Sequence, residues 1–389
     1  GCRGAPRCEA RVGPAGLCFG DPKIDLVGRQ FLPHFQPLPP YWLTVTKRNA
    51  TCVVGTGTGA LNRDLWVGGP RIVLSGGQRV ASLRRQQTIA GPAVCAGVGV
   101  HSGAHVRLVL SPADADTGIV FIRSDVRGVD NVIRAHASSV ADTRNATTLR
   151  NDAGVEIATI EHLMSACMGL GVDNLIVEVD GPELPILDGS SAPFVQVLLN
   201  AGLKALTAPQ RVIRILEPVE VQMGAKKAAL LPAEDYDGLD LDVTIRFADA
   251  AIGVQRRRVQ LSAESFLTEI ADARTFGFLA DVDAMRAAGL GRGASMDNTV
   301  VVGAAGVVNP EGLRFDDEFV RHKLLDAVGD LSLAGAPICG RFVADQPGHA
   351  LNALLVRALL DTPEAWRWEI DTASETGRGA QPLLTAAAG

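Results

Sequence analysis

Apolar and polar positions alternate in a regular way only from about Gln87 onward. The segment 105–110 places an apolar residue at every second position, which is typical of a half-buried strand. Residues 87–94 form another strand-like segment, and a glycine-rich turn at 97–103 lies between the two. This part of the chain therefore predicts a pair of neighbouring strands.

A helical period replaces the alternation at 157–170, where apolar residues recur on one face and glycine follows. After a strand expected at 174–179 comes a second helix at 192–201. Strands and helices then return in a similar order, which predicts an α+β protein of two domains rather than alternating βαβ units. The two domains are expected at 87–208 and 209–373, joined near 207–209. In the second, we expect strands at 211–215, 228–231 and 241–246, and helices at about 263–271, 317–333 and 349–360.

Residues 1–86 differ from the rest in composition. They contain eight prolines and no sustained helical or strand period. Through Gln87 the chain carries 12 Lys and Arg against 4 Asp and Glu, whereas the remainder carries 25 against 39, and this change of sign indicates a boundary. Three interpretations are open: a disordered arm, a targeting segment, or a translation start placed too far upstream. The first methionine is Met164, which favours the third, so we expect the working protein to begin near Val80 or Leu83; intact-mass analysis tests this.

Bulk composition excludes two classes of protein. No run approaches the roughly 18 apolar residues of a membrane-spanning helix, and a net charge of −6 argues against a nucleic-acid-binding protein. The seven cysteines include no CxxC pair, which favours a reducing cytoplasm over a disulfide framework. The tail from about Ser374, rich in Gly, Ala and Thr, is expected to be a dispensable extension.

Two histidines have carboxylates at spacings that suit a metal site. His322 and Asp326 are four residues apart, so a helix stacks them on one face, and Asp330 continues that stripe. Glu161 directly precedes His162 near a helix start, which suits a base beside a metal ligand. Two imidazoles and one carboxylate would leave the fourth position of zinc open, although the same set also suits iron(II). Spacing alone leaves simpler interpretations open: a core histidine beside a helix-start carboxylate, and a His–Asp hydrogen bond on a solvated face.

His349 begins the last expected helix. A helix N-terminus disfavours a charged imidazole unless a carboxylate compensates, and Asp330 is a candidate for that partner. The pair would make His349 a cation able to stabilise an oxyanion or donate a proton; a capping or surface histidine is the alternative. Two other segments do not predict a binding site. The turn at 97–103 is not followed by the helix of a dinucleotide-binding fingerprint. Residues 188–193 could bind phosphate, but they suit a turn with a serine cap for the next helix better.

Six segments of the orderly part form one ordered set of motifs. They are GVGVHSG at 97–103, ATIEHLMS at 158–165, LPILDGS at 184–190, ARTFG at 273–277, FVRHKLLD at 319–326 with Gly329 and Asp330, and GHALN at 348–352. Together they resemble the UDP-3-O-acyl-N-acetylglucosamine deacetylase family, which acts at the committed step of lipid A synthesis in Gram-negative bacteria. The resemblance covers about Gln87 to Leu360. It implies two similar two-layer domains of sheet and helix, packed against each other with the active site between them.

The resemblance also implies a metal and a base. Zinc would be held by His162, His322 and Asp326, where it activates a water molecule and polarises the acetamide carbonyl. Glu161 is implied as the base that takes the proton from that water.

Further roles follow from the same resemblance. Thr275 is implied to hydrogen-bond the developing oxyanion. His349, held by Asp330, is implied as a cationic stabiliser or as the acid that protonates the leaving amine. Lys323 is implied to contact polar groups of the substrate, and its place beside His322 predicts that it points away from the metal face and toward the cleft rim.

An insert at about 278–308 corresponds in the family to a hydrophobic passage for the acyl chain. Each candidate has an alternative role in an ordinary small core, and apolar wall area contributes about 0.8 kcal/mol per buried CH₂. The expected wall, with Phe276 nearby, consists of Leu279, Val282, Leu290, Met296 and Val301.

Three functions compete on these grounds. A hydrolase that releases acetate from UDP-3-O-acyl-N-acetylglucosamine uses every motif. A deacetylase for another acetylated amino sugar would leave the apolar insert idle, and a non-catalytic metal or nucleotide-sugar binding protein would not need Glu161, Thr275 and His349 together. We expect the first, acting in the cytoplasm as a monomer and without a nucleic-acid partner.

Overall fold

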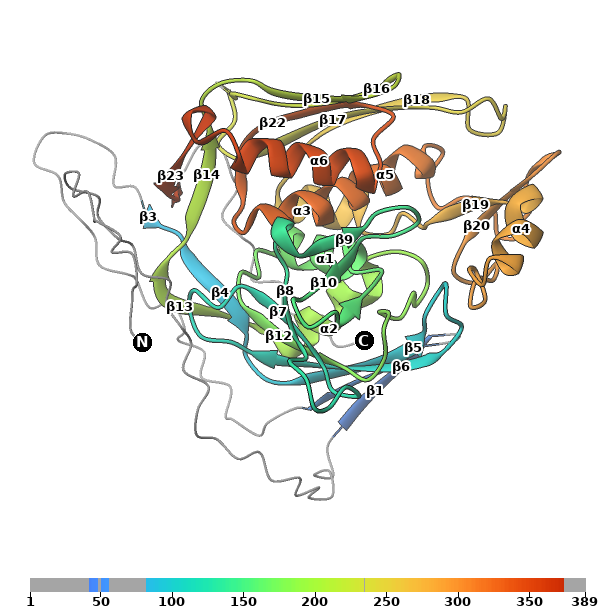
Figure 1. Cartoon of the computed structure of the whole chain (residues 1–389), viewed down its shortest axis with the longest axis horizontal. Helices are drawn as coiled ribbons and strands as arrows, with labels where there is room; N and C mark the ends of the chain where they lie inside the picture. The colour runs from blue at the N-terminus through green and yellow to red at the C-terminus, as the bar shows by residue number, and fades with distance from the viewer. Residues whose placement is uncertain (1–41, 48–49, 56–81, 234, 374–389) are drawn as a thin grey trace, which may run out of the picture. The chain divides into compact units, whose positions relative to one another are not determined.

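In the computed structural model, the described residues are 42–47, 50–55, 82–233 and 235–373, and they belong to one compact unit (Figure 1). Most of the predicted extension and the whole predicted tail lie outside these residues, so the hypotheses about them stay predictions. Within the extension the structure describes strands β1 (Trp42–Lys47) and β2 (Ala50–Gly55), where the sequence predicted no regular element. They pair with each other, and β2 pairs with the next strand, through backbone hydrogen bonds that need no apolar period.

The first sheet has seven strands among the described residues. The alternation predicted at 105–110 is confirmed, since the apolar side chains of one strand are buried at every second position. The segment 87–94 is two strands instead of one, because the chain bends at 90–91 before Pro92, which has no N–H for a ladder. In order, the sheet contains β1, β2, β5 (Ala93–Val98), β6 (His105–Pro112), β12 (Leu175–Val179), β7 (Ile119–Arg123) and β8 (Val132–Arg134).

The second sheet also has seven strands in the described part of the chain. One of its strands, β22 (Ile338–Asp345), pairs with three neighbours. The others are β14 (Arg211–Ile215), β15 (Val219–Met223), β16 (Lys226–Leu231), β17 (Leu239–Arg246), β18 (Val254–Gln260) and β23 (Trp366–Ile370).

The two sheets repeat one strand order. In the first, β5, β6, β12, β7 and β8 are joined by antiparallel, antiparallel, parallel and antiparallel pairings. In the second, β15, β16, β22, β17 and β18 are joined in the same sequence of directions. We call these the first and second strand repeats. The predicted α+β composition is confirmed, whereas the division into two separate domains stays a prediction.

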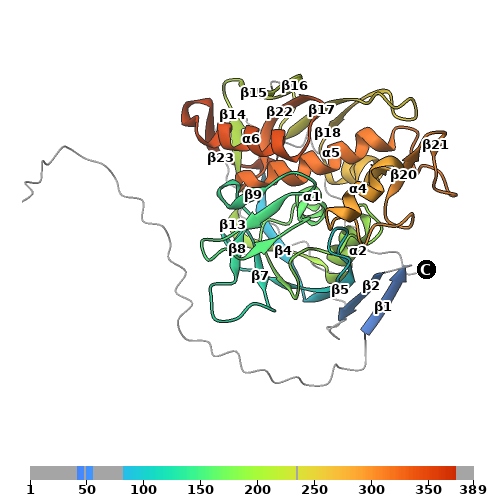
Figure 2. The same ribbon diagram turned by 45° about the vertical axis from the view of Figure 1, so that its right-hand side comes forward.

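In each repeat, one α-helix comes next before the central strand in the sequence and one comes next after it. These are α1 (Glu161–Leu170) and α2 (Ala192–Ala201) around β12, and α5 (Glu318–Leu331) and α6 (His349–Leu360) around β22. All four lie between the two sheets, and α1 packs directly against α5 (Figures 1 and 2). Gly329 makes this contact close, because a Cβ there would lie 2.2 Å from the carbonyl oxygen of Glu161.

Helix ends differ from the sequence predictions where the backbone is irregular. The helix predicted at 157–170 begins only at Glu161, because residues 156–157 form a strand, β11 (Glu156–Ile157), and Thr159 has a φ of +58°. The helix predicted at 263–271 is a short α3 (Ala263–Ser265) followed by a π-helical turn at Phe266–Ile270. The helices predicted at 192–201 and 349–360 are confirmed.

Several small sheets of short strands lie outside the two seven-stranded sheets. Residues 207–209, predicted as a linker, are instead the last part of β13 (Leu203–Pro209), which pairs with β4 (Arg85–Ile89). Near the site, β9 (Val140–Asp142) and β10 (Thr148–Arg150) form a small sheet with β11. A further pair joins β3 (Ser82–Leu83) to β24 (Thr372–Ala373).

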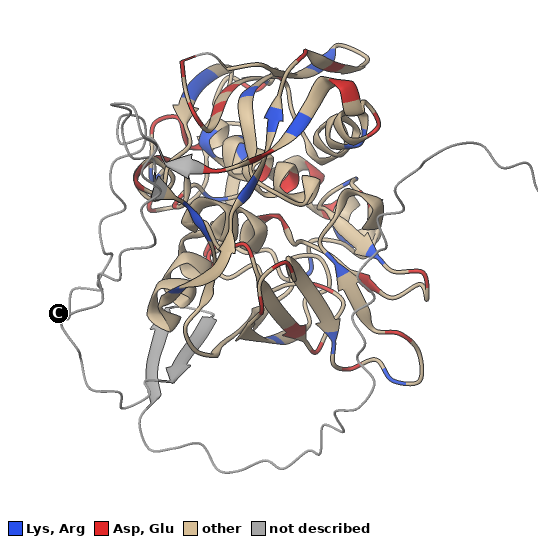
Figure 3. Ribbon diagram, turned by 90° about the vertical axis from the view of Figure 1, so that its left-hand side faces the viewer, with Lys and Arg blue, Asp and Glu red and all other residues tan. Residues whose placement is uncertain are grey.

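Acidic and basic residues are interspersed over both sheets in the view of Figure 3. On the second sheet they pair across strands: Asp242 of β17 lies 2.8 Å from Arg256 and 2.9 Å from Arg341. No helix among the described residues has the length and apolar character needed to cross a membrane.

Candidate metal centre

The three predicted ligands come from the two helices that touch. His162 is the second residue of α1, whereas His322 and Asp326 lie one turn apart on α5. All three are almost fully buried, at 2–3% exposure. The close approach at Gly329 therefore brings one imidazole from the first repeat to an imidazole and a carboxylate from the second.

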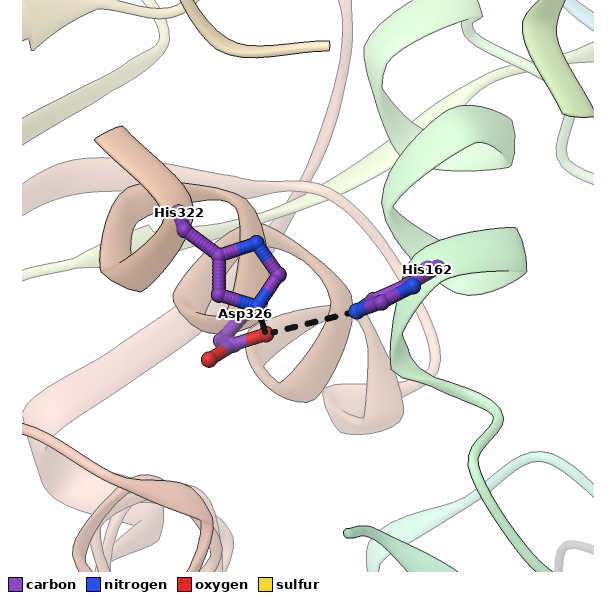
Figure 4. A group of neighbouring side chains, drawn as sticks. All are labelled: His162, His322 and Asp326. Atoms are coloured by element: carbon purple, nitrogen blue, oxygen red, sulfur yellow. Dashed lines mark ion pairs between the residues drawn. The ribbon is translucent and has the colours of Figure 1, made fainter. Parts of the chain in front are cut away.

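The ligand atoms converge on one point (Figure 4). One ligand atom from each residue lies within 4.8 Å of the other two. Asp326 Oδ1 is 3.3 Å from His322 Nε2 and 3.9 Å from His162 Nε2, and the two rings stand edge to face at 5.1 Å. This spacing fits three atoms that share a cation.

Hydrogen bonding around the ligands also fits a cation. Asp326 Oδ1 is buried and accepts no hydrogen bond from any described residue, which is costly for a carboxylate oxygen unless a cation lies against it. His322 Nδ1 is 3.1 Å from the carbonyl oxygen of Ala273, an arrangement that leaves Nε2 to face the shared point.

The protonation states match those of metal ligands. Burial lowers the pKa of His162 to about 3 and lowers that of His322 as well, so both rings are neutral near pH 7. Burial opposes ionisation of Asp326, but the electrostatic effects of His322 and of the Lys323 ammonium outweigh it and hold the pKa of the carboxyl below its usual range. Neutral imidazoles and an ionised carboxylate are the forms that bind metal.

The prediction that Lys323 points away from the metal face is wrong. Its Nζ donates a hydrogen bond to Asp326 Oδ2 at 2.7 Å and lies 5.4 Å from the centre of the Phe276 ring. Residues three apart are neighbours on a helix, and the long lysine side chain reaches across that distance. Because Lys323 occupies Oδ2, the other oxygen of Asp326 is the one that faces the histidines.

Beside the ligands, Glu161 and Asp330 flank His349. His349 Nδ1 is 2.9 Å from Asp330 Oδ2, which confirms the predicted pairing, and Nε2 is 3.7 Å from Glu161 Oε1. Burial alone would lower the pKa of His349, but the two carboxylates outweigh it and raise the pKa to about 10. Burial raises the pKa of Glu161 to about 7. The arrangement thus offers a proton acceptor near neutrality beside a group that is cationic at neutral pH.

Two polar residues here were given no role by the sequence analysis. Asn352 Nδ2 donates to Asp330 Oδ2 at 2.9 Å. Thr147 donates its hydroxyl to Asp330 Oδ1 at 2.6 Å and its backbone N–H to Glu161 Oε2 at 3.1 Å. The i,i+3 spacing of His349 and Asn352 could have indicated the asparagine, but no local signal indicates the threonine, which lies far from its partners in the sequence.

Thr275 follows the segment that orients His322. Its backbone N–H donates to the carbonyl oxygen of Gly189 at 2.8 Å, and it lies two residues after Ala273. The side chain is half-buried, and its hydroxyl takes part in no side-chain hydrogen bond within the described part of the chain. It is therefore free to bind a ligand atom.

The predicted acyl-passage residues differ in their exposure and in their distance from the cluster. Phe276 lies in β19 (Phe276–Phe278), with its ring 6.3 Å from that of His322. Val282, at the start of α4 (Val282–Ala287), Leu290 and Val301 of β20 (Val300–Gly303) are half-buried. Leu279 and Met296 are 54% and 46% exposed. Of the predicted passage residues, Phe276 thus lies beside the metal centre, and the others are half-buried or exposed.

Comparison with known proteins points to one family. The model of the UDP-3-O-acyl N-acetylglycosamine deacetylase family matches residues 86–361. A UDP-3-O-acyl-N-acetylglucosamine deacetylase of Phenylobacterium zucineum (strain HLK1) is 54% identical over 282 residues, which cover 72% of this chain and 95% of the relative. Proteins of the same name from Geobacter sp. (strain M21) and from Photobacterium profundum are 48% and 45% identical, over 72% and 75% of this chain and 90% and 95% of their own lengths.

Proposed function

Because the chain belongs to the UDP-3-O-acyl N-acetylglycosamine deacetylase family, we propose that it hydrolyses the N-acetyl group of UDP-3-O-acyl-N-acetylglucosamine with zinc as its metal. The products are acetate and UDP-3-O-acyl-glucosamine, and the reaction belongs to lipid A biosynthesis. The observation that carries the chemistry is the buried cluster of His162, His322 and Asp326 beside Glu161.

Zinc fits the donor set of two neutral imidazoles and one carboxylate, and iron(II) is the alternative metal. When bound, such an ion supplies Lewis-acid polarisation of the acetamide carbonyl and lowers the pKa of water. His162, His322 and Asp326 would hold it. The unpaired Oδ1 of Asp326 and the bond from His322 to Ala273 support this assignment.

Glu161 is the proposed general base. Its carboxylate is adjacent in sequence to a ligand, is buried, and has a pKa raised to about 7, which suits a group that must take up and give back a proton near neutrality. The N–H of Thr147 holds one carboxylate oxygen, and the other faces His349.

His349 is the proposed cationic stabiliser of the oxyanion, with Asp330 as its counter-charge. Its raised pKa keeps the ring protonated at neutral pH. Thr275 would add a hydroxyl donor to the same oxyanion. A protonated His349 next to Glu161 can also give a proton to the leaving amine, so the second proton transfer belongs to one or both of these residues.

Substrate contacts are proposed on α5 and on the insert. Lys323 would bind polar groups of the substrate, because its ammonium lies at the edge of the site beside the Phe276 ring. The acyl chain would follow a wall that consists of Phe276, Leu279, Val282, Leu290, Met296 and Val301.

We further infer two similar α+β domains, residues 87–208 and 209–373, with the active site between them. The repeated strand order and the origin of the ligands from α1 and α5 support this division. We place the enzyme in the cytoplasm as a monomer, which fits its step in lipid A synthesis.

The test is acetate release from UDP-3-O-acyl-N-acetylglucosamine by the full chain, before and after chelation and after zinc is returned. Chelation should abolish turnover and zinc should restore it. Glu161→Ala should retain bound zinc, as determined by elemental analysis, while turnover falls at least 100-fold. His322→Ala should lose the zinc. Wild-type turnover in Glu161→Ala would refute the general base, and active protein without metal would refute the site.

A further inference from the structure

Glu161 and Asp330, which lie on different helices, are bridged twice. On one side His349 links them, with 3.7 Å to Glu161 Oε1 and 2.9 Å to Asp330 Oδ2. On the other side Thr147 links them, with its N–H 3.1 Å from Glu161 Oε2 and its hydroxyl 2.6 Å from Asp330 Oδ1. The four residues form a closed ring in which each carboxylate uses one oxygen for His349 and the other for Thr147.

Thr147 is held where it can make both bonds. It is 1% exposed and directly precedes β10 (Thr148–Arg150), whose pairing with β9 and β11 fixes the backbone. Because the N–H belongs to the main chain, its bond to Glu161 survives any substitution except proline. The bond to Asp330 depends on the hydroxyl alone, so the two functions of this residue can be separated.

The hydroxyl fixes the rotation of the Asp330 carboxylate. Asp330 Oδ2 accepts from both His349 and Asn352, whereas Thr147 is the one side-chain donor to Oδ1 within the described chain. Asp330 is 2% exposed, so water does not replace that donor readily. Without the hydroxyl, Oδ1 would be buried and unpaired, and the carboxylate could turn and release the ring of His349 from its direction toward Glu161.

We propose that Thr147 is a positioning residue of the site: its hydroxyl holds Asp330 so that His349 stays directed at Glu161. This inference rests on the proposed deacetylation. The hydroxyl of Thr147 bonds to Asp330 and not to the metal ligands or to Glu161, so its effect passes through Asp330 and His349 and appears in the chemical step rather than in substrate binding.

The experiment compares three variants of the full chain. Thr147→Val removes the hydroxyl and retains the branched shape. Thr147→Ser retains the hydroxyl. Thr148→Val is the matched control, because it removes a neighbouring hydroxyl that makes none of the bonds of the ring. Thr147→Ala adds no atoms and replaces the valine variant if that variant does not fold.

We expect kcat of Thr147→Val to fall about tenfold or more, with KM within about twofold of wild type and bound zinc unchanged. Thr147→Ser should lie within about threefold of wild type, and Thr148→Val should match it. Wild-type kcat in both Thr147→Val and Thr147→Ala, or an equal loss in Thr148→Val, would overturn the inference.

A second readout does not depend on turnover. In ¹H–¹⁵N spectra of the imidazole groups, the Nδ1 proton of His349 should exchange slowly with water in wild type, Thr147→Ser and Thr148→Val, and rapidly in Thr147→Val. Slow exchange in Thr147→Val would count against the positioning role. If the wild-type chain releases no acetate, the proposed function fails, and this spectrum still decides whether Thr147 orients the pair.

Discussion

The two strand repeats follow the same order but contribute different parts of the site. The first contributes two adjacent residues, Glu161 and His162, at the start of α1, where the irregular backbone at Thr159 fixes the beginning of the helix. The second contributes a stripe along α5, His322, Asp326 and Asp330, with His349 at the start of α6. A repeated strand framework thus carries different groups in its two halves, and the proposed chemistry depends on the contact between α1 and α5.

The largest effect should come from Gly329→Ala, which tests that contact directly. The new methyl group would lie 2.2 Å from the carbonyl oxygen of Glu161, so α5 would have to move away from α1. We expect zinc affinity, measured by competition with a chromophoric chelator, to fall more than 100-fold, and the free energy of unfolding to fall by about 1–3 kcal/mol. Gly91→Ala is the control, since nothing lies within 4 Å of a Cβ there. Tight zinc binding by Gly329→Ala would show that the halves need not approach so closely.

The pH dependence of turnover should report the ionisation of one group from each repeat, Glu161 from the first and His349 from the second. As the proposed base, Glu161 would act when ionised, and burial raises its pKa to about 7, so kcat should rise as pH increases through about 7. His349 acts when protonated; burial opposes its charge, but Asp330 and Glu161 raise its pKa to about 10, so kcat should fall above about pH 10. His349→Gln should lower kcat about 100-fold and remove the alkaline limb. If the limb near pH 10 persists in that variant, another group causes it.

Lys323→Met tests the proposed substrate contact of Lys323, which lies on α5 of the second repeat. The variant retains an apolar stem beside Phe276 and loses the ammonium. We expect KM to rise about tenfold, as for the loss of one charge-assisted hydrogen bond, with zinc content unchanged because Asp326 uses its other oxygen toward the histidines. Lys227→Met on β16, at an exposed position, is the control. A loss of zinc instead of a rise in KM would assign Lys323 to the metal centre.

The smallest effects should come from the outer part of the insert. Leu279 and Met296 are already 54% and 46% exposed, so their truncation removes little buried area. We expect Leu279→Ala and Met296→Ala each to raise KM about two- to fivefold for long-chain substrates, and to leave short-chain substrates unchanged. The control is Val254→Ala on β18, which is 64% exposed. Equal effects for all chain lengths would argue against an acyl passage.

Regular elements were predictable where local pattern determines them. Helices α2 and α6 match their predicted ranges because apolar spacing and flanking residues mark both ends. The start of α1 was predicted too early, because the sequence around Thr159 does not reveal its left-handed backbone. Residues 207–209 were predicted as a linker and form strand β13, because their pairing with β4 is a contact that local composition cannot report.

The residues of the site also differ in whether a local sequence pattern marks them. The ligand set and the pair of His349 with Asp330 were predictable from spacing and from resemblance, since each lies in a short motif. The direction of Lys323 was not, because it depends on which face of α5 meets the rest of the site. Thr147 was missed because its partner Asp330 lies 183 positions away and only the fold joins them.

The origin of the proposed ligands in two repeats has a consequence for stability. His162 and His322 lie about 160 residues apart in the sequence, so one ion bound by both would tie together segments that are distant in the unfolded chain. At a free zinc concentration 1,000 times its dissociation constant, binding to the native state alone adds about 4.1 kcal/mol to the free energy of unfolding. Zinc binding and the free energy of unfolding would therefore be coupled, and a chelator that removes the ion would also destabilise the folded chain.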